Sequence, residues 1–179
     1  TGGNRVGPAR TEGGPASSGC VVVEPVLVEA LAPRHGGARG AITFKPPVTL
    51  SCAMAMQVWN WLDDALLPLT RGHFDVDLTG LQVGGGHECR RRNRAGAGPL
   101  SEHATGQALD IFALDLAGGR RVMVEKPADA ASERFLRAVR QSACGAFMTT
   151  LGPGSDAAHA NHIHIDIQPR RSAASRFCQ

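Results

Sequence analysis

Two stretches of the chain alternate apolar and polar residues with the period of two that is typical of a β-strand. The first covers residues 108–116 and places Asp110 on the face opposite to Leu109 and Ile111. The second covers residues 161–168, and its isoleucines fill one face. Its other face carries His162, His164, Asp166 and Gln168. Because a charge inside an apolar strand is costly to bury alone, we expect a cation or a metal beside Asp110.

Helical spacing is strongest over residues 50–69, where apolar side chains recur every three or four positions. Ser51 or Thr49 is suited to cap the start of this helix, and Pro68 followed by Gly72 predicts its end. The methionine and tryptophan residues on its apolar face are interpreted as core packing.

A second amphipathic helix is predicted over residues 129–143. Further strands are predicted at 20–30, within 74–83, at 120–125 and at 146–151. These elements predict an α+β fold, in which a central antiparallel sheet flanked by helices carries the functional site. We expect one domain over residues 20–179, preceded by a flexible arm over residues 1–19 that is rich in Gly, Pro, Ser and Ala.

The composition gives no sign that the chain binds nucleic acid or spans a membrane. The net charge is +3 and the apolar fraction is 42%, so nothing marks the chain as a nucleic-acid binder. No apolar run is long enough to span a membrane. The arginines cluster locally only over residues 89–94 (C-R-R-R-N-R). Such a cluster is usually a solvated loop, but here it shortly precedes His103, so one arginine could reach an anionic group of a substrate.

Five isolated cysteines, without any C-x-x-C pair, favour disulfides and an oxidising compartment over buried free thiols. Cys178, next to the C-terminus, is the natural unpaired residue of an odd set. We expect the pairs Cys20–Cys52 and Cys89–Cys144, although four cysteines allow three pairings.

The candidate chemistry combines His103, seven residues before Asp110, with the histidines of the second alternating strand. If the two strands are neighbours, two imidazoles and a carboxylate converge and leave the fourth position of a tetrahedral zinc open. That is the arrangement of a catalytic zinc, whose bound water becomes acidic near neutral pH. A single histidine is more often an ordinary core or surface residue, but this combination would need several coincidences. The H-E-x-x-H and G-x-S-x-G motifs are absent.

These strings resemble a known group. S-E-H-A-T-G-Q-A-L-D with N-H-I-H-I-D is similar to the signature of the zinc D-alanyl-D-alanine peptidases, which include the penicillin-insensitive murein endopeptidases and have the hedgehog signalling domain as a relative. The chain resembles more closely the bacterial extensin-like C-terminal domain family, from about Cys20 to Cys178. The strings that carry this resemblance are L-S-C-A-M-A, C-R-x-R-N, L-S-E-H-A-x-G and L-G-P-G-S-D-A-x-H.

The resemblance implies a fold like that of the hedgehog and D-Ala-D-Ala-peptidase domains, and a role for several residues. The metal ligands, for Zn²⁺, are His103, Asp110 and His164. His162 would orient the water or stabilise the oxyanion, and His159 would be a further active-site histidine. Arg90 or Arg92 would hold a substrate carbonyl or carboxylate. Ser101 would support a ligand or orient the substrate.

The chain departs from that group at Asn161, where many of these peptidases carry a glutamate that acts as the general base. The base must then be His159, His162 or the nearby Asp156, or the site is inactive.

The leading hypothesis is a monomeric, periplasmic or secreted zinc metallopeptidase of the D,D- or L,D-type, which hydrolyses D-amino-acid-containing peptidoglycan peptides. The alternative is an inactive zinc-holding module that binds wall peptides or a protein partner. A weaker third idea is a structural or storage metal.

Overall fold

One mixed sheet organises the chain in the computed structural model, which describes residues 3–11, 19–35, 40–172 and 174–179. Within these residues the sheet has nine strands in the order β1-β2-β3-β4-β5-β8-β7-β9, with β6 paired to β5. They are β1 (Arg5–Pro8), β2 (Pro25–Leu31), β3 (Ile42–Ser51), β4 (Leu78–Gly84), β5 (Ala108–Leu116), β6 (Arg121–Met123), β7 (Thr149–Leu151), β8 (Ile163–Asp166) and β9 (Phe177–Cys178). Neighbours are antiparallel except β3 with β4 and β7 with β9. The predicted α+β domain is confirmed, with a sheet that is mixed.

The first helical region begins where it was predicted but ends later. Helix α1 (Cys52–Trp61) is capped by Ser51, whose Oγ accepts a hydrogen bond from the Met54 N–H. A π-helical turn, η2 (Leu62–Leu66), leads into α2 (Leu67–Phe74). Pro68 does not end the helix: it follows the π-helical turn directly and lies in the first turn of α2.

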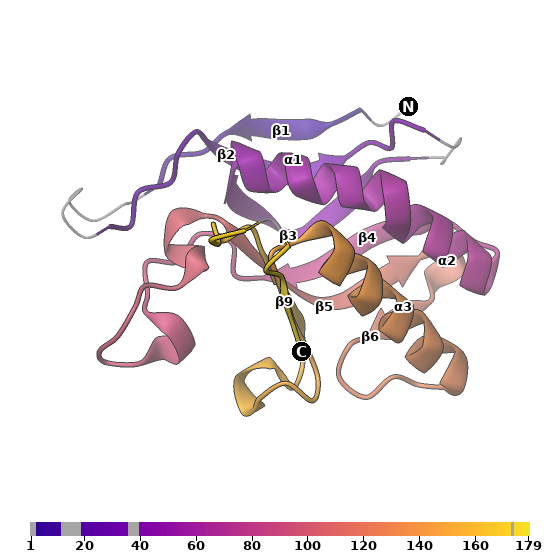
Figure 1. Cartoon of the computed structure of the whole chain (residues 1–179). Helices are drawn as coiled ribbons and strands as arrows, with labels where there is room; N and C mark the ends of the chain where they lie inside the picture. The colour runs from indigo at the N-terminus through magenta and orange to yellow at the C-terminus, as the bar shows by residue number, and fades with distance from the viewer. Residues whose placement is uncertain (1–2, 12–18, 36–39, 173) are drawn as a thin grey trace.

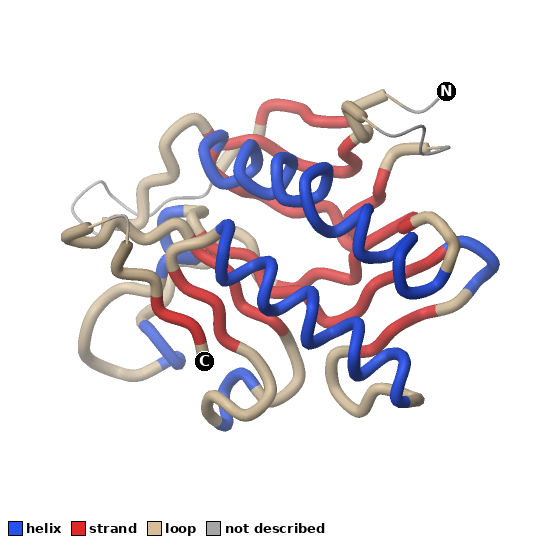
Figure 2. The backbone as a smooth tube through the Cα atoms, turned by 45° about the vertical axis from the view of Figure 1, so that its right-hand side comes forward, coloured by secondary structure: helices blue, strands red, loops and turns tan. Residues whose placement is uncertain are grey.

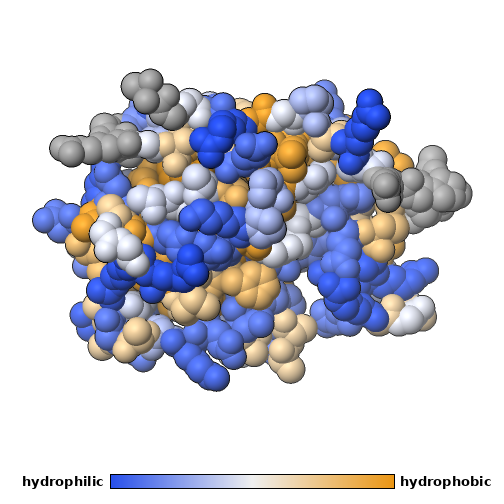
Figure 3. All heavy atoms as spheres, turned by 180° about the vertical axis from the view of Figure 1, so that it is seen from behind, coloured by the Kyte–Doolittle hydropathy of each residue, from blue (hydrophilic) through white to orange (hydrophobic). Residues whose placement is uncertain are grey.

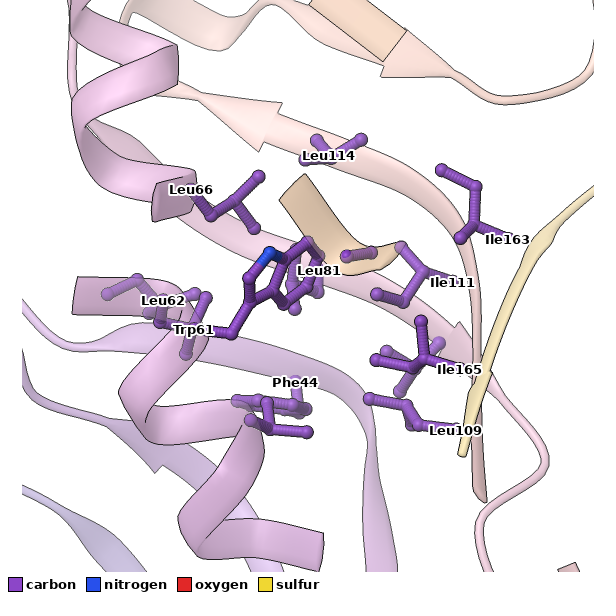
Figure 4. Packing of buried hydrophobic residues seen from close by; sticks show 14 of the residues in the cluster. Phe44, Trp61, Leu62, Leu66, Leu81, Leu109, Ile111, Leu114, Ile163 and Ile165 are labelled. Atoms are coloured by element: carbon purple, nitrogen blue, oxygen red, sulfur yellow. The ribbon is translucent and has the colours of Figure 1, made fainter. Parts of the chain in front are cut away.

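The helices cover one face of the sheet, and the core lies between them (Figure 1, Figure 2). The third helix is α3 (Ala130–Ala146), capped by Asp129. Trp61 is almost fully buried, meets the Phe147 ring edge-on at 5.5 Å between centroids, and donates its Nε1–H to Ser142 Oγ on α3. The sheet side chains of this core include Phe44, Leu81, Leu109, Ile111, Leu114, Ile163 and Ile165 (Figure 4).

The core assignment decides where the polar side chains of β5 and β8 lie. Since Leu109, Ile111, Ile163 and Ile165 belong to the core, the residues that alternate with them lie on the face away from the helices. Asp110 and His164 are therefore on the same open face of the sheet. The two predicted strands that carry them are confirmed as β5 and β8.

Three strands differ from the sequence expectation. Residues Arg5–Pro8, which were predicted to belong to a flexible arm, form strand β1 and pair with β2. Residues 1–2 and 12–18 of that predicted arm lie outside the described residues. Strand β3 was not predicted, because Pro46 and Pro47 interrupt the β pattern. Strand β9 lies in a tail that reads as polar. It pairs only at its two residues with β7.

The presence of disulfides is confirmed, but the expected pairing is wrong. The bonds join Cys20 to Cys89 and Cys144 to Cys178, with Cα–Cα distances of 5.4 and 5.7 Å. Cys52 is the free thiol. The reason is topological: Cys144, near the end of α3, lies beside the strand β9 that carries Cys178. Two disulfides are compatible with an extracytoplasmic location. No helix of the described residues is long and apolar enough to cross a membrane.

Removing the Cys144–Cys178 bond should destabilise the protein. Cys144→Ser with Cys178→Ser should lower the free energy of unfolding by about 2–4 kcal/mol, because the unfolded chain regains the entropy of an open loop. Denaturant unfolding measures this loss. Cys52→Ser is the control and should change stability little, and a non-reducing peptide map that links Cys52 to another cysteine would contradict the assigned pairing.

Candidate metal centre

Strands β5 and β8 bring the central groups together by register. Asp110 lies directly opposite His164 in this antiparallel pair, and both point from the open face of the sheet. The His164 Nδ1 is 2.8 Å from Asp110 Oδ1. Residues 54 apart in sequence thus meet because two strands with alternating patterns are neighbours.

A short 3₁₀ helix, η4 (Glu102–Thr105), delivers His103 to the same place. Ser101 caps it, since its Oγ accepts a hydrogen bond from the His103 N–H. The helix ends at Gly106, which has a left-handed φ of 66°. Gly106 also lies so close to Ser51 that a Cβ would be 2.9 Å from the Ser51 nitrogen. Ser101 therefore supports the predicted ligand through its backbone.

His103, Asp110 and His164 form a cluster whose ligand atoms all lie within 4.8 Å of one another, so these residues could hold a metal ion. The His103 Nε2 is 3.3 Å from Asp110 Oδ2. All three side chains are buried. The structure thus brings together the three ligands that the sequence predicts.

The hydrogen bonding of His103 fits a metal in this position. Its Nδ1 lies 2.9 Å from the Gly86 carbonyl oxygen. Because a carbonyl can only accept, Nδ1 carries the proton, and in the neutral ring Nε2 then carries a lone pair. This buried Nε2 has no hydrogen-bond partner and faces the Asp110 carboxylate. This nitrogen can face Asp110 as a protonated donor, or as a lone pair that shares a metal ion with the carboxylate.

The second histidine of the cluster is held between two carboxylates. His164 Nδ1 faces Asp110, and its Nε2 lies 3.2 Å from Asp166 Oδ2. Burial alone would lower the pKa of His164, but these hydrogen bonds outweigh it and raise the pKa to about 9. Asp166 fixes the orientation of this ring, and with the Nε2 proton donated to Asp166 the Nδ1 atom could bind a metal.

The central carboxylate is strongly favoured as an anion. Burial would raise the pKa of Asp110, but the neighbouring imidazoles of His103 and His164 hold it well below its ordinary value. Gly85 closes the site on the other side, with a left-handed φ of 65°. A Cβ there would lie 3.2 Å from Asp110 Oδ2 and 3.4 Å from His103 Cε1, so a side chain at this position would crowd the cluster.

His162 lies next to the cluster and is oriented by Asn161. Its Nδ1 is 2.8 Å from Asn161 Oδ1, and its Nε2 is 3.5 Å from Asp110 Oδ1. The ring also packs on Phe112, with 5.0 Å between centroids. Burial lowers the pKa of His162 despite the charge of Asp110, which favours the neutral imidazole. Asn161, which cannot take up a proton, thus holds the ring.

His159 and Asp156 form a hydrogen-bonded pair at the edge of the cluster. His159 Nδ1 lies 2.7 Å from Asp156 Oδ1, and the ring centroids of His162 and His164 are 5.3 and 5.5 Å away. Burial would raise the pKa of Asp156, but the hydrogen bond and charge of His159 lower it. An ionised Asp156 therefore keeps the proton of a neutral His159 on Nδ1 and leaves Nε2 free to accept another.

The cluster lies in a cavity of about 450 Å³, which is ample for part of a peptide. Arg90 and Arg92 line it. Both already have anionic partners: Arg90 Nε is 2.9 Å from Glu88, and Arg92 Nη2 is 3.2 Å from Glu102. Seen from behind, hydrophilic side chains gather around a notch at the lower right of the surface (Figure 3).

Glu102 and Arg170 are among the charged residues of the cavity that were not predicted as site residues. Glu102, next to His103, lines the cavity, and burial together with the charge of Asp166 raises its pKa. Arg170 lines it as well. The signal for Arg170 was present, because it continues the every-second-residue series of polar side chains that begins at His162 and passes through Gln168. This signal was overlooked because the tail from Arg170 onward has a polar composition.

Comparison with known proteins finds one family. The model of the family described as extensin-like protein C-terminus matches residues 4–179, nearly the whole chain. No curated protein and no solved structure matches the chain.

Asp110→Asn should abolish metal retention. We expect the wild type to keep one metal ion per chain after dialysis, and the variant to keep none, because the amide removes the charge that balances the metal. Elemental analysis of the dialysed protein measures this. Asp115→Asn is the matched control: Asp115 is also a buried aspartate of β5, but it pairs with Arg121 and Lys45. Equal metal content in both variants would refute the assignment.

Proposed function

The chain belongs to the family of extensin-like protein C-terminal domains, and we propose that it is a zinc-dependent hydrolase of peptidoglycan peptides. The observation that carries the proposal is the buried cluster of His103, Asp110 and His164 at a cavity large enough for a peptide. Two imidazoles and one carboxylate are a donor set of catalytic zinc sites, in which a fourth position stays open.

Zinc bound here would polarise a peptide carbonyl and acidify a water molecule. The chain's own residues then have separable tasks. His103 and His164 offer one nitrogen each to the ion, while the Gly86 carbonyl and Asp166 accept the protons on their other nitrogens. These outer hydrogen bonds hold both rings in the tautomer that a metal requires.

We assign the general base to His159. Its Nε2 would accept the proton of the attacking water, and Asp156 would stabilise the imidazolium that results. His162 is the weaker base, because burial lowers its pKa. His162 donates its Nδ1 proton to Asn161 Oδ1, so Nε2 of the neutral ring is a hydrogen-bond acceptor. An acceptor can orient a water molecule, but it cannot donate a hydrogen bond to an oxyanion.

The substrate class rests on the motif likeness to the zinc D-alanyl-D-alanine peptidases, whose serine, histidine, glycine, alanine and aspartate positions recur here. They are Ser101, His103, Gly106, Ala108 and Asp110. A periplasmic or secreted location, which the two disulfides fit, would place the chain beside peptidoglycan. Arg90 and Arg92 would bind substrate carbonyl or carboxylate groups by releasing Glu88 or Glu102.

Purified peptidoglycan tests the proposal directly. We expect new peptide fragments in the presence of the protein, their loss on addition of a chelator, and their return with added zinc. Mass spectrometry of the soluble products identifies the bond that is cut. If chelator-sensitive fragments are absent for the wild type, the chain is not a hydrolase of these peptides.

His159→Gln should lower kcat by about 10²–10⁴, the usual contribution of a general base, with unchanged metal content. His73→Gln is the matched control, since His73 is exposed on α2, on the helix-covered side of the sheet. Turnover of the same peptides is measured for both. A nearly normal His159→Gln enzyme combined with an inactive His162→Ala enzyme would assign the base to His162 instead.

A second candidate function is favoured by Asn161, which replaces the glutamate base of many similar peptidases. In that case the chain is a zinc-holding module that binds wall peptides or a protein partner. Measured affinity for wall fragments without turnover, unchanged by His162→Ala, would support the module, whereas turnover would exclude it.

A further inference from the structure

Arg170 occupies an unusual position in the wall of the cavity. Its Nη2 donates a hydrogen bond to Thr149 Oγ1 at 2.8 Å, and its guanidinium carbon lies 5.8 Å from the centroid of the Phe177 ring. Its Nε is buried and has no hydrogen-bond partner. A guanidinium has five N–H donors, so most of the hydrogen-bonding capacity of this head group is unused by the described residues.

The other arginines of the cavity, unlike Arg170, form ion pairs with glutamates. Arg90 and Arg94 share Glu88, and Arg92 pairs with Glu102. Arg170 has no carboxylate partner within 4 Å among the described residues. It is therefore the cavity arginine in this part of the chain whose positive charge is not balanced by an ion pair, and a partly buried cation of this kind favours an anionic ligand.

The fold holds this arginine from two sides, through Thr149 and Phe177. Thr149 lies on β7 opposite Asp166, the residue that accepts the hydrogen bond of His164. Phe177 belongs to β9, and its backbone N–H donates a hydrogen bond to the Met148 carbonyl oxygen at 2.9 Å. The neighbouring Cys178 is fixed to α3 by its disulfide to Cys144. Arg170 thus sits on the Asp166 side of the metal cluster, against a wall that the C-terminal strand builds.

We propose that Arg170 is a specificity-determining residue that binds a free carboxylate of the peptide while the peptide bond to be cut lies at the His103–Asp110–His164 cluster. This inference rests on the proposed function and names the substrate feature that the site selects. A planar guanidinium pairs with a planar carboxylate through two parallel hydrogen bonds, which makes it selective for that group over a neutral amide. Peptides with a free carboxylate near the scissile bond should therefore be preferred over their amidated counterparts.

Matched peptides test this preference on the metal-loaded, full-length chain. A synthetic wall pentapeptide is prepared with its carboxylates free, with the C-terminal carboxylate amidated, with the internal carboxylate amidated, and with both amidated. For the wild type, we expect amidation of the recognised carboxylate to lower kcat/KM by about 10–100-fold, the range of one charge-assisted interaction. The two singly amidated peptides identify which carboxylate is bound.

Substitution at Arg170 should erase that difference. Arg170→Gln should raise KM for the free-carboxylate peptide about 10–100-fold with little change in kcat, and leave the doubly amidated peptide unaffected. Arg170→Lys should restore part of the preference, because it keeps the charge but loses the bidentate geometry. Arg171→Gln is the matched control, since Arg171 is exposed and is not part of the cavity lining. A purely structural role for Arg170 would weaken turnover of both peptides equally and would overturn the inference.

Calorimetric binding of the same peptides separates this inference from the proposed function. If the chain binds wall peptides without cleaving them, the free-carboxylate form should still bind about 10–100-fold more tightly than the amide, and Arg170→Gln should abolish the difference. The inference then stands while the hydrolase proposal fails. Equal binding and equal turnover of free and amidated peptides by the wild type would overturn the inference without any variant, and would leave hydrolysis intact where fragments still appear.

Discussion

The site depends on one physical constraint: an ionised carboxylate, Asp110, is buried on the open face of the sheet among the imidazoles of three histidines. The Gly86 carbonyl accepts the Nδ1 proton of His103, so that Nε2 is the nitrogen that faces the carboxylate. A buried carboxylate needs a compensating positive charge, either from protonated imidazoles or from a metal ion. A metal ion between these atoms turns the same arrangement into a favourable one, and this is the central reason for proposing a metal centre here.

The rest of the fold can be understood as support for this cluster. Alternation along β5 and β8 sends isoleucine and leucine into the helix-covered core and sends the ligands outward, so that the hydrophobic core positions the site without taking part in it. Gly85 and Gly106 allow the chain to pass closely where a side chain would crowd the cluster or collide with Ser51. One disulfide fixes Cys89, close to Arg90, and the other pins the C-terminal strand near Arg170. A disulfide therefore restrains the chain next to Arg90 and next to Phe177, two residues of the cavity lining.

Much of this could be predicted from sequence, and the failures have physical causes. Strict alternation placed Asp110 and His164 correctly, because the period of a strand leaves no choice of face. Cysteine pairing could not be deduced, since it depends on which loops the folded sheet brings together. Strand β3 was not predicted because the prolines at positions 46 and 47 usually indicate the end of a strand. Arg170 was not predicted because its polar tail masked the every-second-residue series that it continues, and the structure places it in the cavity lining beside Thr149.

The most direct measurement of the central claim is a crystal structure of the zinc-loaded protein, with anomalous scattering recorded at the zinc edge. We predict a single strong anomalous peak bound by His103 Nε2, Asp110 and His164 Nδ1, with solvent or a ligand in the fourth position. A peak elsewhere, or no peak at this cluster in protein that was loaded with zinc, would contradict it. A fourth ligand supplied by the protein would equally contradict it, because a closed site could hold a metal but could not activate water.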